Sequence, residues 1–283
     1  MNAGASLVSV IVPTRNSART LESCLISIRS QAYKPIELIV VDNASTDQTV
    51  EIAKLHADLV EAFGPERSAQ RNRGARLAHG AHLLFIDSDM RVASNVVGEC
   101  MDVVRTRHAR GVVIPELSVG EGFLARCRAF ERSCYVGDDM VEAARFFPRP
   151  VFEAVGGFDE SLDAFEDWDL SMRIGVGSSL PRVRSYITHD EGELRLRAVM
   201  AKKRLYGASF LRYWRKHSRS ALGKANPLFR PAFLRNWPKF VGHPVLATGV
   251  IVLKSLEAAA ATWGLVEGQL GARRERGSRP RSS

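Results

Sequence analysis

A long stretch in the C-terminal third of this sequence has no acidic residue. Residues 194–256 contain 14 Lys and Arg residues and no Asp or Glu, whereas residues 1–193 contain 21 Lys and Arg against 28 Asp and Glu. The net charge of +9 therefore comes from one part of the chain. Such a basic stretch binds phosphates, either on an anionic membrane surface or on nucleic acid. A solvated face or a protein contact would carry the same charges, and the acidic first 193 residues argue against a broad nucleic-acid surface.

Cysteine is scarce, and two phosphate-binding motifs are missing. The four cysteines are not spaced as metal ligands, and Cys24 and Cys100 lie in expected helices, so we expect reduced, buried thiols. No Gly-x-Gly-x-x-Gly follows an expected strand, which excludes a dinucleotide-binding Rossmann site. Residues 12–16, Val-Pro-Thr-Arg-Asn, also lack the glycine-rich loop that a sugar-nucleotide nucleotidyltransferase, our alternative enzyme class, would need for its phosphates.

No apolar run is long enough to be read as a membrane span. The stretch from Val245 to Leu253 is bounded by His243 and Lys254, and it has about half the length that a spanning helix needs. We expect it to lie in a membrane interface or to pack on the protein. The N-terminus has no basic region followed by an apolar one, so we expect no signal peptide and a cytoplasmic catalytic part.

The first 190 residues alternate between short apolar runs and amphipathic segments. This order predicts an α/β fold with a parallel sheet flanked by helices, and the hydrophobic content of 45% is ample for its core. After the strand expected at 111–115, we expect the segment up to about residue 145 to be helical. The expected strands are 7–12, 37–42, 57–63, 83–86, 111–115 and 183–188, and the expected helices are 20–31, a helix of about ten residues after 43–47, 68–78, 95–107 and 166–173.

One expected strand stops abruptly at two carboxylates, Asp87 and Asp89. The four apolar residues from Leu83 to Ile86 suit a strand buried on both faces, and ligands bind beyond the carboxyl ends of such strands. Two unpaired carboxylates repel each other, whereas a divalent cation would relieve the repulsion and hold a diphosphate. Asp-Ser-Asp is also an ordinary turn before a helix. These residues alone leave both interpretations open.

Six motifs occur in one order along the chain. Together they resemble a family-2 inverting glycosyltransferase with the GT-A fold, a mostly parallel sheet flanked by helices, over residues 7 to about 190. The motifs are Val-Pro-Thr-Arg-Asn, Val-Val-Asp-Asn-Ala-Ser-Thr-Asp, Gln-Arg-Asn-Arg-Gly, Ile-Asp-Ser-Asp, Val-Gly-Gly-Phe-Asp-Glu and Glu-Asp-Trp-Asp-Leu.

The resemblance implies a site for a nucleotide-sugar donor. Asp42 matches the position that faces the base, and Arg71 matches a basic residue that approaches the nucleotide part of the donor. The Asp-Ser-Asp stretch matches the Asp-x-Asp motif that reaches the ribose and the metal. The implied donor-binding residues are Pro13, Arg15, Asp42, Arg71, Asp87 and Ser88.

The resemblance also implies a Mg²⁺ or Mn²⁺ ion. Asp89 matches the more direct ligand of the metal, and Asp87 matches a second one. His189 stands where some relatives supply a further contact to the metal or the diphosphate, although a histidine that ends a strand is also commonly structural. Many relatives have a third acid in this motif, where the present sequence has Met90. The metal shell is therefore expected to need His189 or water.

The resemblance assigns the general base to Asp167, with Glu166 as a supporting or acceptor-binding residue. Transfer of a sugar requires an acceptor hydroxyl to lose its proton as it attacks C1, and a single displacement inverts that centre. Carboxylates in the first turn of a helix are also stabilised by the helix dipole, which would be a structural reason for the same residues. Trp168 could stack on a sugar ring or belong to the core.

The sequence thus predicts three regions and one activity. Residues 1–192 would form the GT-A catalytic domain, 193–270 a basic amphipathic helical region that associates with membranes, and 271–283 a disordered tail. The expected activity is metal-dependent, inverting transfer from a nucleotide-sugar to a hydroxyl of a lipid-linked or cell-envelope polysaccharide acceptor. The enzyme would be peripheral at the inner face of the plasma membrane and would not bind nucleic acid. The non-enzymatic alternatives are a scaffold and a nucleic-acid-binding protein that uses the basic residues.

Overall fold

The computed structural model describes residues 5–139, 141–175, 179–225 and 231–277. The chain divides into two compact units, and neither is continuous in sequence. Unit 1 comprises Met1–Val119, Tyr135–Ser161 and Glu166–Glu191, and unit 2 comprises Gly120–Cys134, Leu162–Phe165 and Gly192–Ser283.

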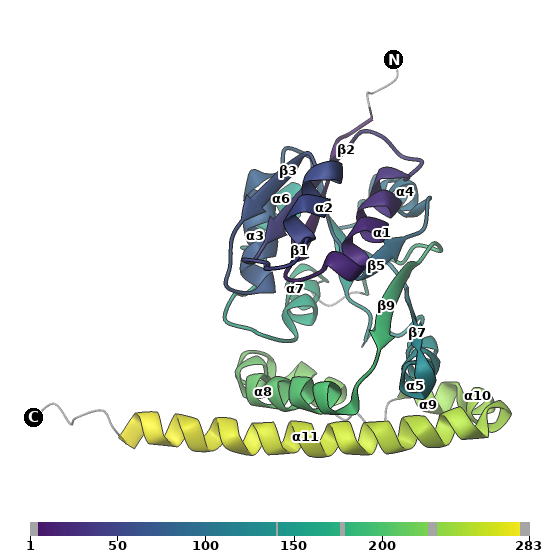
Figure 1. Cartoon of the computed structure of the whole chain (residues 1–283), viewed down its shortest axis with the longest axis vertical. Helices are drawn as coiled ribbons and strands as arrows, with labels where there is room; N and C mark the ends of the chain where they lie inside the picture. The colour runs from purple at the N-terminus through teal and green to yellow at the C-terminus, as the bar shows by residue number, and fades with distance from the viewer. Residues whose placement is uncertain (1–4, 140, 176–178, 226–230, 278–283) are drawn as a thin grey trace, which may run out of the picture. The chain divides into compact units, whose positions relative to one another are not determined.

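Unit 1 is built on a six-stranded sheet with the order β3-β2-β1-β4-β8-β6, and Figure 1 labels the first three of these strands. Four neighbouring strands are parallel, and β8 is antiparallel to both of its neighbours. The register pairs Thr14 with Asp42, so the first two strands end side by side. The expected α/β fold with a mostly parallel sheet is confirmed. The strands are β1 (Val8–Thr14), β2 (Ile36–Asp42), β3 (Leu59–Ala62), β4 (His82–Phe85), β6 (Val112–Val113) and β8 (Ala144–Pro148).

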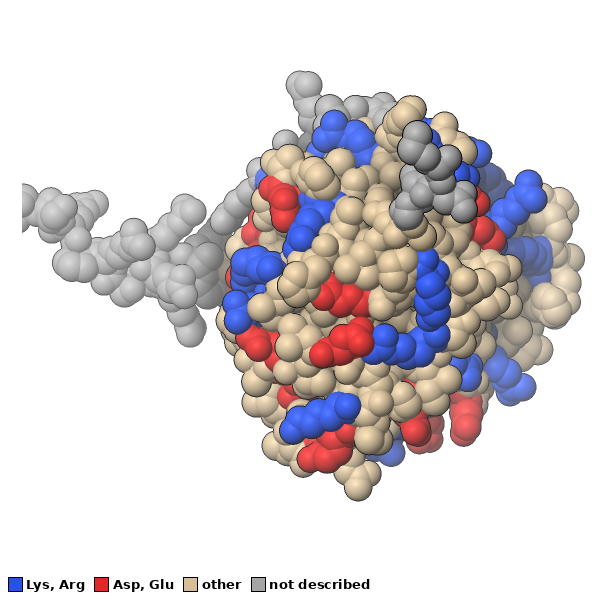
Figure 2. All heavy atoms as spheres, turned by 90° about the horizontal axis from the view of Figure 1, so that it is seen from above, with Lys and Arg blue, Asp and Glu red and all other residues tan. Residues whose placement is uncertain are grey.

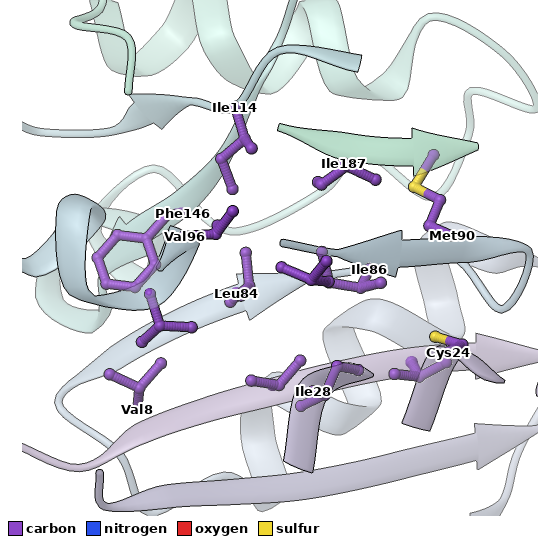
Figure 3. Packing of buried hydrophobic residues seen from close by; sticks show 14 of the residues in the cluster. Val8, Cys24, Ile28, Leu84, Ile86, Met90, Val96, Ile114, Phe146 and Ile187 are labelled. Atoms are coloured by element: carbon purple, nitrogen blue, oxygen red, sulfur yellow. The ribbon is translucent and has the colours of Figure 1, made fainter. Parts of the chain in front are cut away.

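Helices cover both faces of this sheet because its central strands are apolar on both sides. Val8, Val10 and Val12 of β1 pack with α1 and α4 on one face, where Figure 3 shows part of the cluster. Ile11 points to the other face, toward α3, α6 and α7. All four cysteines are free and buried, as expected. The helices of unit 1 are α1 (Ala18–Arg29), α2 (Thr49–His56), α3 (Arg67–Leu77), α4 (Val96–Arg107), α6 (Arg149–Ala154) and α7 (Glu166–Gly175).

A second sheet of three strands has the order β5-β9-β7. It contains β5 (Met90–Val92), β7 (Glu116–Glu121) and β9 (Ile187–Glu193), and Met90 pairs with His189. Two of our expectations were wrong here. The strand expected at 183–188 begins only at Ile187, and the segment expected to be helical up to residue 145 contains β7 and the start of β8 besides a helix. Both errors concern strands that pair with distant parts of the chain.

Unit 2 is helical. It contains α5 (Gly122–Ser133), α8 (Leu196–Ala225), α9 (Pro231–Arg235), α10 (Trp237–Gly242) and α11 (Pro244–Gly277). Helices α8 and α11 pack closely, because a Cβ on Gly264 would lie 1.8 Å from the Arg204 carbonyl oxygen. The short apolar stretch from Val245 is part of the 34-residue helix α11, whose segment Pro244–Gln269 is long and apolar enough to cross a membrane. Helix α11 also continues to Gly277, where we expected disorder, and residues 278–283 lie outside the described part.

Figure 2 shows a face on which acidic and basic side chains are interspersed among uncharged ones. The described residues of this face do not form a continuous basic surface of the kind that tracks a nucleic-acid backbone. This distribution agrees with the acidic balance of residues 1–193.

Candidate functional site

The loops after β1 and β2 are tied together by Asp42. Its buried carboxylate accepts hydrogen bonds from Thr14 Oγ1 at 2.8 Å, from the Ser45 backbone N–H at 2.8 Å and from the Ser45 hydroxyl. Gln70 of α3 donates to the Thr14 and Val41 carbonyl oxygens, at 2.9 and 2.6 Å. The carboxyl edge of the sheet is therefore a fixed platform, and Asp42 is one of its structural links.

The other residues that we expected near the nucleoside lie along the same edge. Pro13 is buried in β1, opposite Val41, and Arg15 is exposed in the loop that follows. The Ser88 hydroxyl donates to Ser17 Oγ at 2.8 Å. Of these three side chains, only that of Arg15 is fully open to solvent.

Arg71 lies at the centre of the site. This α3 side chain is only 4% exposed and donates to Asp87 Oδ1 at 2.5 Å and to Glu166 Oε1 at 2.9 Å. Its guanidinium also stacks on the ring of Phe158, 5.2 Å from the ring centroid. Burial alone would lower the pKa of Arg71, but the two carboxylates raise it, so the guanidinium keeps its charge.

A second arginine, Arg145 of β8, reaches the same carboxylate. It donates to Asp87 Oδ2 at 3.4 Å and, through Nε at 2.9 Å, to Glu116. Burial would raise the pKa of Asp87, but the charges of Arg71 and Arg145 hold it well below the ordinary range. Sequence reasoning missed Arg145 and Glu116. The available signal was a charged residue at the start of the apolar run Ala-Arg-Phe-Phe.

Asp167 is the partly exposed acid in the first turn of α7. One of its oxygens accepts a hydrogen bond from the Trp168 backbone N–H at 2.8 Å. Burial and the neighbouring charge of Glu166 raise the pKa of Asp167. The Trp168 indole N–H donates to the Val141 carbonyl oxygen at 2.9 Å, which fixes the position of that ring.

Asp89 and His189 form a pair at the junction of β5 and β9. Asp89 Oδ2 lies 3.2 Å from His189 Nε2. Asp89 Oδ1 and His189 Nδ1 are buried atoms without a hydrogen-bond partner. A further acid, Glu191, has its Oε1 at 3.8 Å from His189 Nδ1. Two ligand atoms at this position are thus left unsatisfied by the protein.

The expected trio of metal ligands does not converge. Asp87 is turned toward the two arginines, and within the described ranges no three His, Cys, Asp or Glu side chains are grouped to hold a cation. Asp89 and His189 remain as a pair with buried, unpaired ligand atoms. Mg²⁺ is commonly bound through one or two carboxylates together with waters and substrate phosphates, so this pair fits such an ion.

The Gly156-Gly157 turn is anchored beside the site. The Asn72 side chain accepts from the Phe158 backbone N–H and donates to its carbonyl oxygen, both at 2.9 Å. Gly157 has φ +69°, and a Cβ on it would lie 2.7 Å from Asn72 Oδ1. The turn therefore needs glycine at this position, both for its backbone and for its contact.

Gly157→Ala is expected to destabilise the protein by more than Gly156→Ala. Both glycines have positive φ, so both substitutions carry the left-handed backbone cost of about 1–2 kcal/mol. Only the alanine at 157 also meets neighbouring side chains, Asn72 and the Phe152 ring at 3.2 Å, since nothing lies within 4 Å of a Cβ at Gly156. Urea unfolding of the two variants measures the cost of these contacts, and equal losses would show that both side chains move aside freely.

The combined geometry is an edge of a parallel sheet where arginines and carboxylates meet. Arg71 and Arg145 supply positive charge, and Asp167 supplies a carboxylate whose raised pKa suits it to accept a proton. The pair of Asp89 and His189 could hold a cation, and Asp89 follows the arginine-bound Asp87 by only two residues. Such a set could bind an anionic substrate and take a proton from a hydroxyl.

Comparison with known protein families agrees with this description. The family model described as "Glycosyl transferase family 2" matches residues 9–128. A PGL/p-HBAD biosynthesis glycosyltransferase of Mycobacterium bovis is 28% identical over 178 residues, which cover 60% of this chain and 70% of that protein. The glycosyltransferase YibD of Escherichia coli is 34% identical over 91 residues, 30% of this chain and 26% of YibD.

Solved structures resemble the fold at low sequence identity. Mannosyltransferase PcManGT from Pyrobaculum calidifontis, in complex with GDP-Man and Mn²⁺, matches with a TM-score of 0.59 and 20% identity, covering 95% of this chain and 76% of that chain. S. aureus TarS 1-349 in complex with UDP-GlcNAc matches with a TM-score of 0.54 and 21% identity, covering 72% and 66%. The match to a longer TarS chain spans only 39% of it. These likenesses confirm the expected fold class.

Proposed function

Because the chain belongs to glycosyl transferase family 2, we propose that it moves a sugar from a nucleotide-sugar donor to an acceptor hydroxyl, with a divalent cation and with inversion. The observation that carries this proposal is the position of Asp167. Its pKa is raised, and it directly follows Glu166, which forms an ion pair with Arg71. That cluster combines a base with groups that can neutralise a diphosphate.

The proposed donor site is the carboxyl edge of β1, β2 and β4. Pro13, Arg15, Asp42 and Ser88 are assigned to the nucleoside, with Arg71 and Asp87 at the nucleotide's ribose and phosphate end. Two structures with this fold are complexes with nucleotide-sugars, UDP-GlcNAc in TarS and GDP-Man in PcManGT. They support a nucleotide-sugar as the donor class.

For the cation, we assign Mg²⁺ or Mn²⁺ to Asp89 and His189. The buried, unpaired Asp89 Oδ1 and His189 Nδ1 support this assignment. Asp87 would complete the set only if it turned away from Arg71 and Arg145. A bound divalent cation would supply Lewis-acid neutralisation of the leaving diphosphate. The structure of PcManGT, which contains Mn²⁺, is a precedent within the fold.

Asp167 is assigned as the general base. Its carboxylate takes the proton from the acceptor hydroxyl as that oxygen forms a bond to C1 of the sugar, and the C1–O bond to the nucleoside diphosphate breaks. The diphosphate leaves with the bonding electron pair, and attack from the opposite side inverts C1. Glu166 is held by Arg71 beside the base and is assigned to support it or to contact the acceptor.

The proposed acceptor is lipid-linked or belongs to a cell-envelope polysaccharide. Residues 194–256 carry 14 Lys and Arg and no acid, which favours an anionic membrane surface at about 1 kcal/mol per nearby basic residue. We therefore place the enzyme at the inner face of the plasma membrane as a peripheral protein. Nucleic acid is not a proposed partner.

A thermal-shift panel tests the donor and the metal together. UDP-, GDP-, dTDP- and CMP-sugars are each added with Mn²⁺ and with EDTA. We expect one nucleotide class to raise the melting temperature only with Mn²⁺, and Asp89→Ala to lose that shift because its carboxylate is the direct ligand. Asp102→Ala, on an exposed ion pair of α4, is the matched control and should keep the shift. A shift that is unchanged by EDTA and by Asp89→Ala would contradict the assigned metal site.

A further inference from the structure

Helix α11 buries the charges of its middle turns and exposes apolar side chains. Lys254 and Glu257 are buried, at 5% and 3% exposure. The opposite side of the helix presents six exposed apolar side chains, which we call the α11 outer face. They are Val245, Ile251, Val252, Leu256, Trp263 and Val266.

A buried ionic network holds this orientation. Lys254 donates to Glu131 at 2.9 Å and to Glu257 at 2.7 Å, and Arg128 of α5 pairs with both glutamates. Lys203 of α8 lies 3.8 Å from Glu257. Because an unpaired buried charge is very costly, the network fixes which side of α11 faces α5 and α8. The apolar side must then face outward.

The polar groups on the outward side are satisfied within the helix itself. The hydroxyls of Thr248, Ser255 and Thr262 each donate to the carbonyl oxygen four residues earlier, at 3.0, 2.9 and 2.8 Å. The Trp263 indole N–H donates to Glu267 at 3.0 Å. A surface whose donors need no water can enter an apolar medium at low cost.

The short helices α9 and α10, which precede α11, also expose apolar side chains, and they expose basic residues beside them. Leu234, Trp237 and Val241 of α9 and α10 are exposed apolar side chains, and Arg235 and Lys239 beside them are exposed and basic. Exposed aromatic rings and basic residues next to an apolar face are typical of helices at a membrane interface.

We propose that the α11 outer face docks into a lipid bilayer, with α11 lying in the plane of the interface. The proposal rests on the membrane association in the proposed function and identifies the surface that makes it. The basic residues of 194–256 complement anionic headgroups, whereas in a symmetric pair of chains they would repel one another.

An in-plane position also follows from the neighbours of α11. Helix α8 packs along it in Figure 1 and carries exposed Lys202 and Arg204, which would enter the hydrocarbon if α11 crossed the bilayer. The tight crossing leaves no room for lipid between the two helices, since a Cβ on Gly207 would lie 1.9 Å from the Ala261 carbonyl oxygen. Only the outer face is open to lipid.

Flotation of the full chain with vesicles tests the surface. We expect binding to neutral phosphatidylcholine vesicles to persist in high salt, because the contact is apolar. Anionic phosphatidylglycerol should strengthen binding, and salt should remove this additional affinity. Replacing Val252 and Leu256 together by Asp should weaken binding to neutral vesicles at least about tenfold. Leu55→Asp on α2, at an exposed apolar position of unit 1, is the matched control and should bind as wild type.

Three outcomes would overturn the proposal. If vesicle binding disappears in high salt, the basic residues alone account for that binding. Unchanged binding of the double Asp variant would exclude the outer face. Light scattering that shows a dimer broken by the same two substitutions, without vesicle binding, would make a second copy the occupant. The nucleotide-sugar thermal shift is measured on each variant, so a failure of the donor assignment is seen separately.

A depth measurement distinguishes an in-plane helix from a spanning one. Tryptophan is placed at Val245, Val252 or Val266 in a background whose four native tryptophans are replaced by phenylalanine, and its fluorescence is quenched by lipids brominated at shallow or deep positions. We expect the same shallow pattern at all three sites. Deep quenching at 252 with shallow quenching at 245 and 266 would show that α11 crosses the bilayer.

Discussion

Asp167→Asn is expected to lower the rate of glycosyl transfer by about 10²–10⁴-fold while nucleotide-sugar binding is retained. The amide has nearly the shape of the carboxylate and can still accept the hydrogen bond from the Trp168 N–H, but it cannot take the acceptor's proton. Donor binding depends on the sheet edge and on Arg71, which the substitution leaves in place. The measurement is kcat and KM with the donor identified by thermal shift, together with the shift itself.

The pH dependence checks the same assignment. Burial and Glu166 raise the pKa of Asp167, and the base works only when it is deprotonated. The rate should therefore fall as the pH drops through this raised pKa, at a higher pH than the value of about 3.9 for an ordinary aspartate. Asp102→Asn, on the surface of α4, should change neither the rate nor the profile. Full turnover by Asp167→Asn would place the base elsewhere.

The edge of the sheet could be predicted from sequence because it depends on local patterns. The strands β2 and β4 contain short apolar runs, and Asp42 and Asp87 come at the carboxyl ends of these runs. Parallel strands end at the same edge, so the alternation of strands and helices was enough to bring these acids together. The buried Arg71 was found through its motif rather than through its surroundings, since nothing local marks the arginines of α3 as buried or exposed.

The parts of the site that the sequence did not predict depend on contacts between distant segments. Arg145 reaches Asp87, 58 positions earlier in the sequence, because β8 pairs antiparallel with β4, and no local period reveals such a pairing. The same reason explains α11. In the sequence, Lys254 and Glu257 mark the end of an apolar run. In the structure, Glu131 and Arg128 of α5 pair with these two charges and bury them, so α11 continues past them as one helix.

Arg71→Met is expected to destabilise the folded protein by about 3–5 kcal/mol and to abolish transfer. Methionine keeps the aliphatic length of the side chain but leaves Asp87 and Glu166 without the cation that they share. The cost is large because the arginine is almost fully buried, so water cannot replace it. Urea unfolding at neutral pH measures the loss, and Arg76→Met, at an exposed position of the same helix, is the matched control.

The partner residues provide the second arm of this test. In Arg71→Met with Glu166→Gln the carboxylate that lost its arginine is gone, while Asp87 still pairs with Arg145, so the double variant should recover part of the lost stability. The arginine holds the pKa of Asp87 far below its ordinary value, so the stabilisation is complete above about pH 4 and is lost only as the pH falls toward the depressed pKa. The gap between wild type and Arg71→Met should therefore narrow in acid. A gap independent of pH, with no recovery in the double variant, would show that Arg71 stabilises the fold through its contact with Phe158 instead.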